Sequence, residues 1–382
     1  MWQIFVRFFT LGLISFGGPA AHIGYFRQTF VAQLNWLDDR RYGNIVALSQ
    51  FLPGPGSSQV GFAIGYQMGG IFGAVAAFVG FTLPSFLLLY LMAVTSSIWL
   101  DHSLFQGAIH GLKLLAVVVV ADAVLGMFRQ FCQKTAAKGI MLLSTVLLLL
   151  VSGIAAQIAL IGLSAVLGYV FLIQEDEGPT PGEDAGIRWG YLLSFVILLA
   201  GAVAMAGNGT LVGVAGQFYQ AGSLVFGGGH VVLPLLESTV GGEMSPDRFL
   251  AGYALAQAVP GPMFTLATFL GAEVWLANPL MGALVATLAI FLPGFLLMLA
   301  IIHSWHALSQ RPRVAGIVAG INAGVVGLLF CALYNPVFVS GVQNATDMAL
   351  VVAGFGLLKL VRVHIVLLVA GFAAVGMLLT LI

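Results

Sequence analysis

The sequence predicts an all-α polytopic membrane protein made of two inverted structural repeats with broken or re-entrant helices. Three observations predict this fold: an apolar composition, a duplicated series of motifs, and the distribution of basic residues between loops. Of the 382 residues, 60% are hydrophobic and only 7% are charged, whereas a soluble domain carries about 25% charged residues. The apolar segments are long and helix-like, without the alternation of an outer-membrane barrel. We therefore expect a multi-pass protein of the inner (plasma) membrane, surrounded by lipid.

Composition also excludes several function classes. The formal net charge is zero, which argues against a nucleic-acid partner. Cys132 and Cys331 are the only cysteines, too few for a disulfide framework or a metal site. The chain has no GxxxxGK[ST] phosphate-binding loop, so ATP hydrolysis is not expected. No short charged, apolar and cleavable leader precedes the first helix, so we expect no removable signal peptide. We predict neither metal nor cofactor.

Four motifs occur twice in the same order, about 210 residues apart. One such match between apolar helices could arise by chance, but an ordered series indicates a tandem duplication. The matched pairs are LISFGGPAAH (13–22) with SLVFGGGHVV (223–232), ALSQFLPGPG (47–56) with ALAQAVPGPM (254–263), FTLPSFLLLY (81–90) with IFLPGFLLML (290–299), and, more weakly, AIHGLKLLAVVV (108–119) with IVAGINAGVVGL (317–328).

The duplication sets the domain boundaries. Residues 1–174 form the first repeat and residues 208–382 form the second. Between them, residues 175–207 contain an acidic, Gly- and Pro-rich linker followed by one extra apolar segment. We expect this segment to be a connecting transmembrane helix.

The ordered double set of FGG, PGPG and LP closely resembles the chromate ion transporter family in its two-domain form. The resemblance covers nearly the whole chain. It implies secondary transport of chromate, generally outward, and resistance to chromate. The copies differ at one place, where Gly17-Gly18-Pro19 in the first corresponds to Gly227-Gly228-Gly229-His230 in the second. The two copies are therefore not expected to be equivalent in mechanism.

Each repeat divides into two broken pairs of short helices followed by four longer spans. In the first copy the pairs break at 16–19 and 53–56, where proline removes a backbone donor and glycine permits open conformations. The expected elements of the first copy are 3–34, 39–68, 70–98, 104–130, 139–152 and 155–173, and those of the second are 210–240, 247–275, 279–302, 314–334, 346–359 and 363–382.

Loop charges favour inversion of the second copy. If each broken pair is a hairpin that returns to its own side, nearly all the basic loop residues lie on one face, with Arg248 as the exception. The extra segment 189–207 supplies the odd crossing that inversion requires. The N-terminus is then cytoplasmic. The alternative is that each broken pair is one kinked spanning helix.

The breaks themselves predict an anion site. A helix interrupted at membrane depth frees N–H and C=O groups that lipid cannot satisfy. Secondary transporters place such breaks near the midplane, with helix N-termini pointing at anionic substrates. Free N–H groups and the positive helix end bind an anion without any lysine. A tetrahedral dianion such as chromate suits several converging donors.

The predicted substrate-binding residues are those at the breaks, the hydroxyl residues that follow and one buried lysine. The alternative interpretation is that the breaks are kinks with close-packing glycines, that the hydroxyls bond back to their helices, and that the lysine snorkels to the interface. The predicted set is Gly17, Gly18, Pro53, Gly54, Pro55, Gly56, Ser57, Ser58, Gly227, Gly228, Pro260, Gly261, Pro262, Thr265 and Lys113.

Four ionisable residues are candidates for coupling or gating. Histidine titrates near neutral pH and can carry a proton, and carboxylates inside apolar segments are costly unless they have a role or a partner. The histidines His22 and His230 lie close to the two FGG breaks, while Asp122 and Glu273 lie within apolar helices.

Other functions remain open at this stage. An exchanger or importer of sulfate or another oxyanion would use the same backbone site, so substrate identity comes from the resemblance alone. A membrane scaffold would have no reason to bury Pro-Gly-Pro twice. An enzyme would need a nucleophile with a base or a metal cluster, and no such spacing is found, so we expect a non-enzyme. Whether the chain forms a homodimer is also open.

Overall fold

The fold is known from a computed structural model that describes the chain except residues 17, 100, 101, 152, 174–185, 227–231, 306–311 and 382. Every regular element in the described residues is helical. Four described stretches are long and apolar enough to cross a membrane: Gly56–Thr95, Ser103–Phe131, Pro279–Ile301 and Pro312–Gly341. The predicted all-α, multi-pass architecture is confirmed.

The first broken pair is a hairpin. Helix α1 (Trp2–Ile14) ends at the FGG break, and α2 (Gly18–Phe26) starts just after it and continues as a π-helical turn, η1 (Arg27–Gln33). The chain turns back on itself, because the ring of Phe8 in the middle of α1 lies 5.6 Å from that of Phe26 and 4.7 Å from that of Phe30. Both ends of this pair therefore lie on the same side.

The second broken pair joins α3 (Asp39–Phe51) to the start of α4 (Gly56–Trp99). Helix α4 is itself two helices, because the backbone of Gly69 and Gly70 is non-helical and reverses the chain. A side chain on Gly65 would collide with the carbonyl group of Gly73, so the two arms are in contact. The predicted boundary between 39–68 and 70–98 is thus confirmed.

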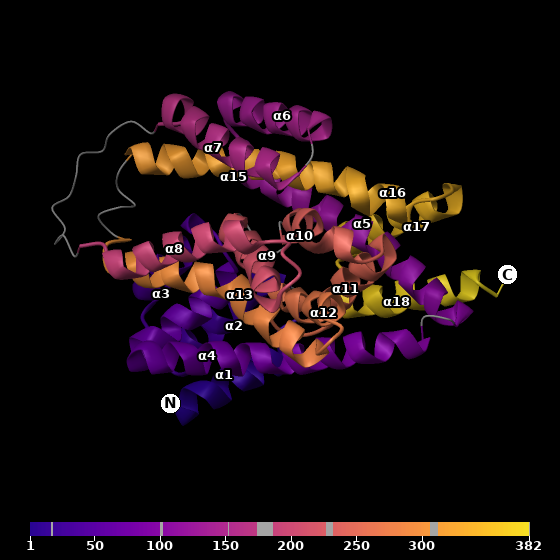
Figure 1. Ribbon diagram of the computed structural model, residues 1–382, viewed down its shortest axis with the longest axis horizontal. Helices are drawn as coiled ribbons and strands as arrows, with labels where there is room; N and C mark the ends of the chain where they lie inside the picture. The colour runs from indigo at the N-terminus through magenta and orange to yellow at the C-terminus, as the bar shows by residue number, and fades with distance from the viewer. Residues whose placement is uncertain are drawn as a thin grey trace.

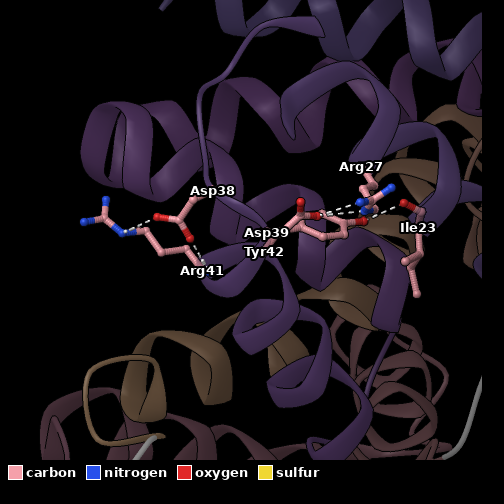
Figure 2. A network of polar contacts seen from close by, with 6 residues as sticks. All are labelled: Ile23, Arg27, Asp38, Asp39, Arg41 and Tyr42. Atoms are coloured by element: carbon pink, nitrogen blue, oxygen red, sulfur yellow. Dashed lines mark hydrogen bonds and ion pairs between the residues drawn. The ribbon is translucent and has the colours of Figure 1, made fainter. Parts of the chain in front are cut away.

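Polar contacts join the two broken pairs of the first repeat at the end of the hairpins that lies away from the breaks (Figure 2). We call this end of a hairpin pair its mouth. Arg27 donates to Asp39 at 2.9 Å, and the Tyr42 hydroxyl donates to the carbonyl oxygen of Ile23 at 2.5 Å. Asp38 caps α3 by accepting from the backbone N–H of Arg41 at 2.7 Å. These contacts fix α3 against α2 where both approach the membrane surface.

The second repeat copies this arrangement. One hairpin consists of α9 (Leu211–Leu224) and α10 (Val232–Val240) with the turn η3 (Gly241–Glu243), and Gln217 on α9 donates to the carbonyl oxygen of Thr239 at 3.0 Å. The other consists of α11 (Pro246–Ala258), η4 (Met263–Thr265) and α12 (Leu266–Val274), and the long α13 (Pro279–Ile301) follows. All four broken pairs are hairpins, so the kinked-helix alternative does not describe the structure.

The remaining helices form the outer part of each repeat. The predicted span 314–334 corresponds to α15, and the segment η5 that follows is kinked, because the backbone of Asn335 is non-helical. These helices are α5 (Ser103–Phe131), α6 (Thr135–Leu150), α7 (Ile154–Phe171), the connecting α8 (Trp189–Met205), α15 (Pro312–Ala332) with η5 (Leu333–Phe338) and α16 (Val339–Gly341), α17 (Ala345–Gly356) with η6 (Leu357–Val361), and α18 (Ile365–Leu379).

The two repeats exchange partners. Helix α5 of the first repeat packs on α18 of the second, and the equivalent α15 packs on α7 of the first. Both interfaces need glycine at the same motif position, since a side chain on Gly111 would overlap the carbonyl oxygen of Phe372, and one on Gly320 would overlap that of Ser164. The core is therefore shared between the repeats and is not divided at the linker.

Figure 1 shows that equivalent helices run in opposite directions. The purple α4 and α5 are joined at the right-hand end of the view, whereas the orange α13 and α15, their counterparts, approach each other at the left-hand end. The N-terminus lies toward the left, with the end of α7 and the start of α8, and the C-terminus lies at the right. The predicted inversion of the second repeat is confirmed.

The arrangement predicts a labelling pattern for an impermeant thiol reagent. After replacement of the two native cysteines, single cysteines at Ser103 and Thr346 should react from one side, and cysteines at Asp39 and Arg188 from the other. The positive-inside rule places Asp39 and Arg188 in the cytoplasm. Labelling of Ser103 and Thr346 from opposite sides would contradict the inverted arrangement.

Candidate functional site

The breaks of the two repeats meet crosswise. The backbone N–H of Gly54, in the first Pro-Gly-Pro, donates to the carbonyl oxygen of Val225, beside the second FGG, at 2.7 Å. The N–H of Gly261, in the second Pro-Gly-Pro, donates to the carbonyl oxygen of Ser15, beside the first FGG, at 2.9 Å. Each repeat thus satisfies backbone groups that the other repeat has freed.

Two glycines are required by this contact. Gly54 has φ +120° and Gly261 has φ +108°, a region that residues with a side chain rarely adopt. A Cβ atom at Gly54 would lie 2.9 Å from Cα of Gly294, and one at Gly261 would lie 2.9 Å from Oγ of Ser85. Gly294 and Ser85 each follow the proline of an LP motif, so three of the four duplicated motifs meet here.

Gly56 differs from its predicted role. The sequence predicts that Gly54 and Gly56 together hold the break open, but only Gly54 has a positive φ. Gly56 is the first residue of α4, and a Cβ atom there would lie 3.6 Å from the carbonyl oxygen of Ser49, an ordinary contact. The open conformation therefore depends on one glycine in each Pro-Gly-Pro.

Gln59 connects the start of α4 to the second repeat. Its Nε2 donates to the carbonyl oxygens of Pro53 at 2.9 Å and Gly294 at 3.1 Å. Its Oε1 is buried and has no hydrogen-bond partner in the described residues. Gln59 was not singled out from the sequence, although it follows PGPGSS directly and corresponds to the apolar Leu266 in the second repeat.

Three buried hydroxyl groups on the elements that meet here also lack a partner within the described part of the chain. They belong to Ser15 at the end of α1, Ser58 in the first turn of α4, and Thr82 one turn before Ser85. A buried hydroxyl that makes no hydrogen bond costs about 1–3 kcal/mol. Such groups normally have a bound water or ligand as partner. Together with the Gln59 oxygen, they mark the crossed breaks as a polar site inside an apolar protein.

His22 joins the two breaks of the first repeat. The side chain is fully buried, with Nε2 3.2 Å from the carbonyl oxygen of Ser15 and Nδ1 3.2 Å from Oγ of Ser57. The edge of the imidazole meets the ring of Phe81, with the centroids 5.3 Å apart. The structure therefore brings the predicted residues His22 and Ser57 into one site with Gly54 and Gly261.

The second repeat contributes backbone but few free polar side chains. Thr265 is buried, and its hydroxyl donates to the carbonyl oxygen of Pro262 at 2.6 Å, within its own turn. Gly18 begins α2 with φ +75°. The predicted residues Gly17, Gly227, Gly228 and His230 lie outside the described residues.

Apart from His22, the predicted ionisable residues in the described part of the chain lie elsewhere, each with a partner. Lys113 pairs with Asp247, and Arg248 pairs with Glu273 at 2.9 Å. Asp247 is in the first turn of α11, whose far end carries the break, about 16 Å away along the helix axis. These four side chains therefore form a cluster at the surface end of the hairpin α11–α12 and are not at the crossed breaks.

Asp122 pairs with Lys359 of the turn η6. It has a partner from the opposite repeat and lies nine residues beyond Lys113 on α5, so the two are not partners of each other. Asp122 thus joins the two repeats at a different place from the cluster on α11 and α12.

A cavity opens at this surface end. It has a volume of about 420 Å³ and is lined by residues that include His110, Lys113, Asp247 and Arg248. His110 also lines a neighbouring cavity of about 400 Å³ and lies 2.8 Å from the buried carboxylate of Asp347. The pair His110 and Asp347 was missed from the sequence, because its members are 237 residues apart and Asp347 lies in none of the duplicated motifs.

The opposite mouth carries an equivalent arginine. Arg41 occupies in the first repeat the position that Arg248 occupies in the second, and it lines a cavity of about 160 Å³ with Gln67, His303 and other residues. Burial and the neighbouring Arg188 guanidinium lower the pKa of His303, so its imidazole is neutral at pH 7. The polar site between the two mouths is buried.

The pair of Lys113 and Asp247 predicts an asymmetric response to substitution. The Lys113 side chain is 7% exposed, whereas that of Asp247 is 70% exposed. Asp247→Asn should destabilise the folded protein by about 2 kcal/mol, because it leaves a buried charge without a partner. Lys113→Met should be close to neutral, because it removes the buried charge itself.

Thermal unfolding in detergent measures both effects, and the double variant should recover most of the stability lost in Asp247→Asn. Equal losses for the two single variants would mean that Lys113 is not held by Asp247.

The comparisons with known proteins agree with this architecture. The sequence profile of the family described as chromate transporter matches residues 2–169 and again residues 212–377. An uncharacterized transporter of Methanocaldococcus jannaschii is 27% identical over 341 residues, which cover 86% of this chain and 82% of that protein. The chromate transport protein of Pseudomonas aeruginosa is 27% identical over 338 residues, covering 86% of this chain and 79% of that protein.

The probable chromate transport protein of Synechococcus elongatus is 28% identical over 353 residues, covering 91% of this chain and 86% of that protein. No solved structure matches this chain. Because the family profile matches both repeats and most of the sequence, the resemblance carried by the duplicated motifs is confirmed, and the chain belongs to the chromate transporter family.

Proposed function

We propose that this protein is a secondary transporter that exports chromate across the cytoplasmic membrane and so confers resistance to it. The oxyanion is held where the broken helices of the two repeats cross. The observation that carries this proposal is the set of buried polar atoms without partners at that place: the hydroxyls of Ser15, Ser58 and Thr82, and Oε1 of Gln59. Family membership and the names of the relatives support chromate as the substrate.

The chemistry of the site suits a tetrahedral dianion. Helices α2 and α4 begin at the breaks, so their free N–H groups and positive ends are available to an anion. The Ser58 hydroxyl adds a donor in the first turn of α4. No lysine or arginine is needed next to the substrate, which keeps the cost of burying the site low once the anion has left.

Alternating access requires only that one mouth opens at a time. Arg41 and Arg248 line the cavities at opposite mouths, through which the anion would enter and leave. One repeat element then rocks against the other around the crossed backbone contacts. Moving a dianion out of a negative interior is electrically downhill, by about 2.3 kcal/mol per charge per 100 mV. Export therefore needs no carboxylate that carries a coupling ion.

Flux through purified protein in vesicles of known orientation tests this function. Radiolabelled chromate should move faster than in empty vesicles, and unlabelled chromate should compete. Sulfate is offered as a second competitor, because it is also a tetrahedral dianion. Stronger competition by sulfate than by chromate would replace chromate with sulfate as the substrate, and no flux of either anion would overturn the proposal.

Ser58→Ala separates substrate binding from stability. The Ser58 hydroxyl is buried without a partner in the described structure, so its removal should leave the melting temperature unchanged or slightly raised. Binding of chromate should weaken about tenfold, because a hydrogen bond to a charged group contributes about 1.5 kcal/mol or more. Equilibrium binding and thermal unfolding are measured on the same preparation.

Thr145→Val is the matched control for Ser58→Ala. The Thr145 hydroxyl is also buried, but it donates to the carbonyl oxygen of Met141 within α6, away from the breaks. This variant should bind chromate like the parent. Parent-like binding by Ser58→Ala would remove Ser58 from the site.

The crossed backbone contact can be tested at its glycines. Gly54→Ala and Gly261→Ala each place a methyl group against the other repeat at a positive φ, so both should reduce flux per inserted molecule at least tenfold. Gly43→Ala in α3 is the control, because a Cβ atom there meets nothing within 4 Å. Normal flux in both break variants, with normal gel-filtration profiles, would show that the contact is not needed for transport.

A further inference from the structure

The hydrogen bonds of His22 fix the positions of its protons. The carbonyl oxygen of Ser15 can only accept, so Nε2 of His22 carries a hydrogen in every protonation state. In the neutral imidazole, Nδ1 then holds a lone pair, and the Ser57 hydroxyl must donate its hydrogen to Nδ1. In the empty site the Ser57 hydroxyl therefore has no hydrogen to offer a substrate.

Protonation of His22 reverses this bond. A proton that binds to Nδ1 makes it a donor, and Nδ1–H then donates to the lone pair of Ser57 Oγ. The hydroxyl hydrogen of Ser57 no longer bonds to Nδ1, so the O–H group can turn toward an oxygen of the anion. One proton thus supplies a positive charge beside the substrate and also a second hydroxyl donor next to that of Ser58.

We propose that His22 and Ser57 form a proton-binding switch, so that the site binds its doubly charged oxyanion together with one proton. This inference rests on the proposed function and adds the coupled ion to it. When the anion leaves, Nδ1 gives up its proton to water, and the Ser57 hydroxyl turns back to donate to Nδ1. The site then returns to its neutral, self-satisfied state.

Among the residues that the structure describes, few other charges lie near enough to replace His22 in this role. Helix α4, which carries Ser57, has no acidic or basic residue. On the elements packed around α2, Arg7 of α1 is exposed and Arg27 of η1 pairs with Asp39. Tyr42 of α3 donates to Ile23, and the His364 ring, at the start of α18, is 6.5 Å from that of Phe16.

The fold does not require a histidine and a serine here. In the second repeat the equivalent positions hold Val232 and Phe264, which are both buried and lie on the corresponding two hairpins. Apolar side chains therefore satisfy the packing of this structure. Packing alone therefore does not explain His22 and Ser57 in the first repeat. A role in binding the anion explains them, because the ring nitrogens of His22 contact both breaks.

The test measures proton uptake when the anion binds. Purified protein in detergent is titrated calorimetrically with sodium chromate, and separately with sodium sulfate, in buffers of different ionisation enthalpy between about pH 7 and pH 9. We expect an uptake that approaches one proton per anion as pH rises, with affinity falling up to tenfold per pH unit. Anion binding without proton uptake overturns this inference and leaves the proposed function intact, whereas absence of anion binding overturns the proposed function.

His22→Gln isolates the titrating group. Glutamine can donate to Ser15 and accept from Ser57, so it reproduces the neutral imidazole but cannot gain a proton. We expect at least tenfold weaker anion binding, no proton uptake and loss of the pH dependence. Proton uptake that persists in this variant would assign the proton to another group.

His364→Asn is the matched control for His22→Gln. Asparagine keeps the N-cap that His364 provides to the N–H of Val366, and proton uptake should remain as in the parent. If His22→Gln fails to fold, absence of proton uptake in the parent protein still overturns the inference, because that titration needs no substitution.

Discussion

The structure depends on one constraint: backbone groups that a broken helix frees inside a bilayer must find partners within the protein. Each of the four hairpins consists of separate helices, and Pro-Gly-Pro lies between the helices of two of them, so each repeat contains freed donors and acceptors at membrane depth. The hydrogen bonds from Gly54 to Val225 and from Gly261 to Ser15 meet this need across the repeats. A single repeat would lack these partners, which gives a physical reason why the two copies are joined in one shared core.

Duplication has kept the backbone of the site and changed its side chains. Gly54 and Gly261 have nearly the same φ and approach equivalent positions on α13 and α4. Beyond them, Ser57, Ser58 and Gln59 of the first repeat correspond to Phe264, Thr265 and Leu266 of the second. One half therefore presents polar groups and the other closes the site with apolar packing. The backbone at the crossed breaks is therefore nearly symmetric between the repeats, whereas the polar side chains there come mainly from the first repeat.

The charged side chains described above, unlike the neutral polar groups, lie away from the crossed breaks. Lys113, Asp247, Arg248 and Glu273 gather at one mouth, where each buried charge, on Lys113 or Glu273, is paired with a more exposed one. The centre is left with neutral groups and helix ends, through whose partial charges the proposed site would bind an anion and release it again. A permanent positive charge at the crossed breaks would bind a dianion more firmly, whereas the proposed proton switch would supply a charge only while the anion is bound.

The sequence by itself determined the fold class, the duplication and its inversion, and the position of the breaks, because composition, motif order and loop charges are local properties that can be read along the chain. It also identified His22, Ser58, Gly54 and Gly261 as candidates. Only the tertiary structure decided the pairing of side chains. Lys113 and Glu273 were candidates for the substrate and coupling sites, yet each has a partner on the hairpin α11–α12, and Gln59 was overlooked. Partners 134 or 235 residues apart in sequence are chosen by how the two repeats cross, and no local pattern contains that information.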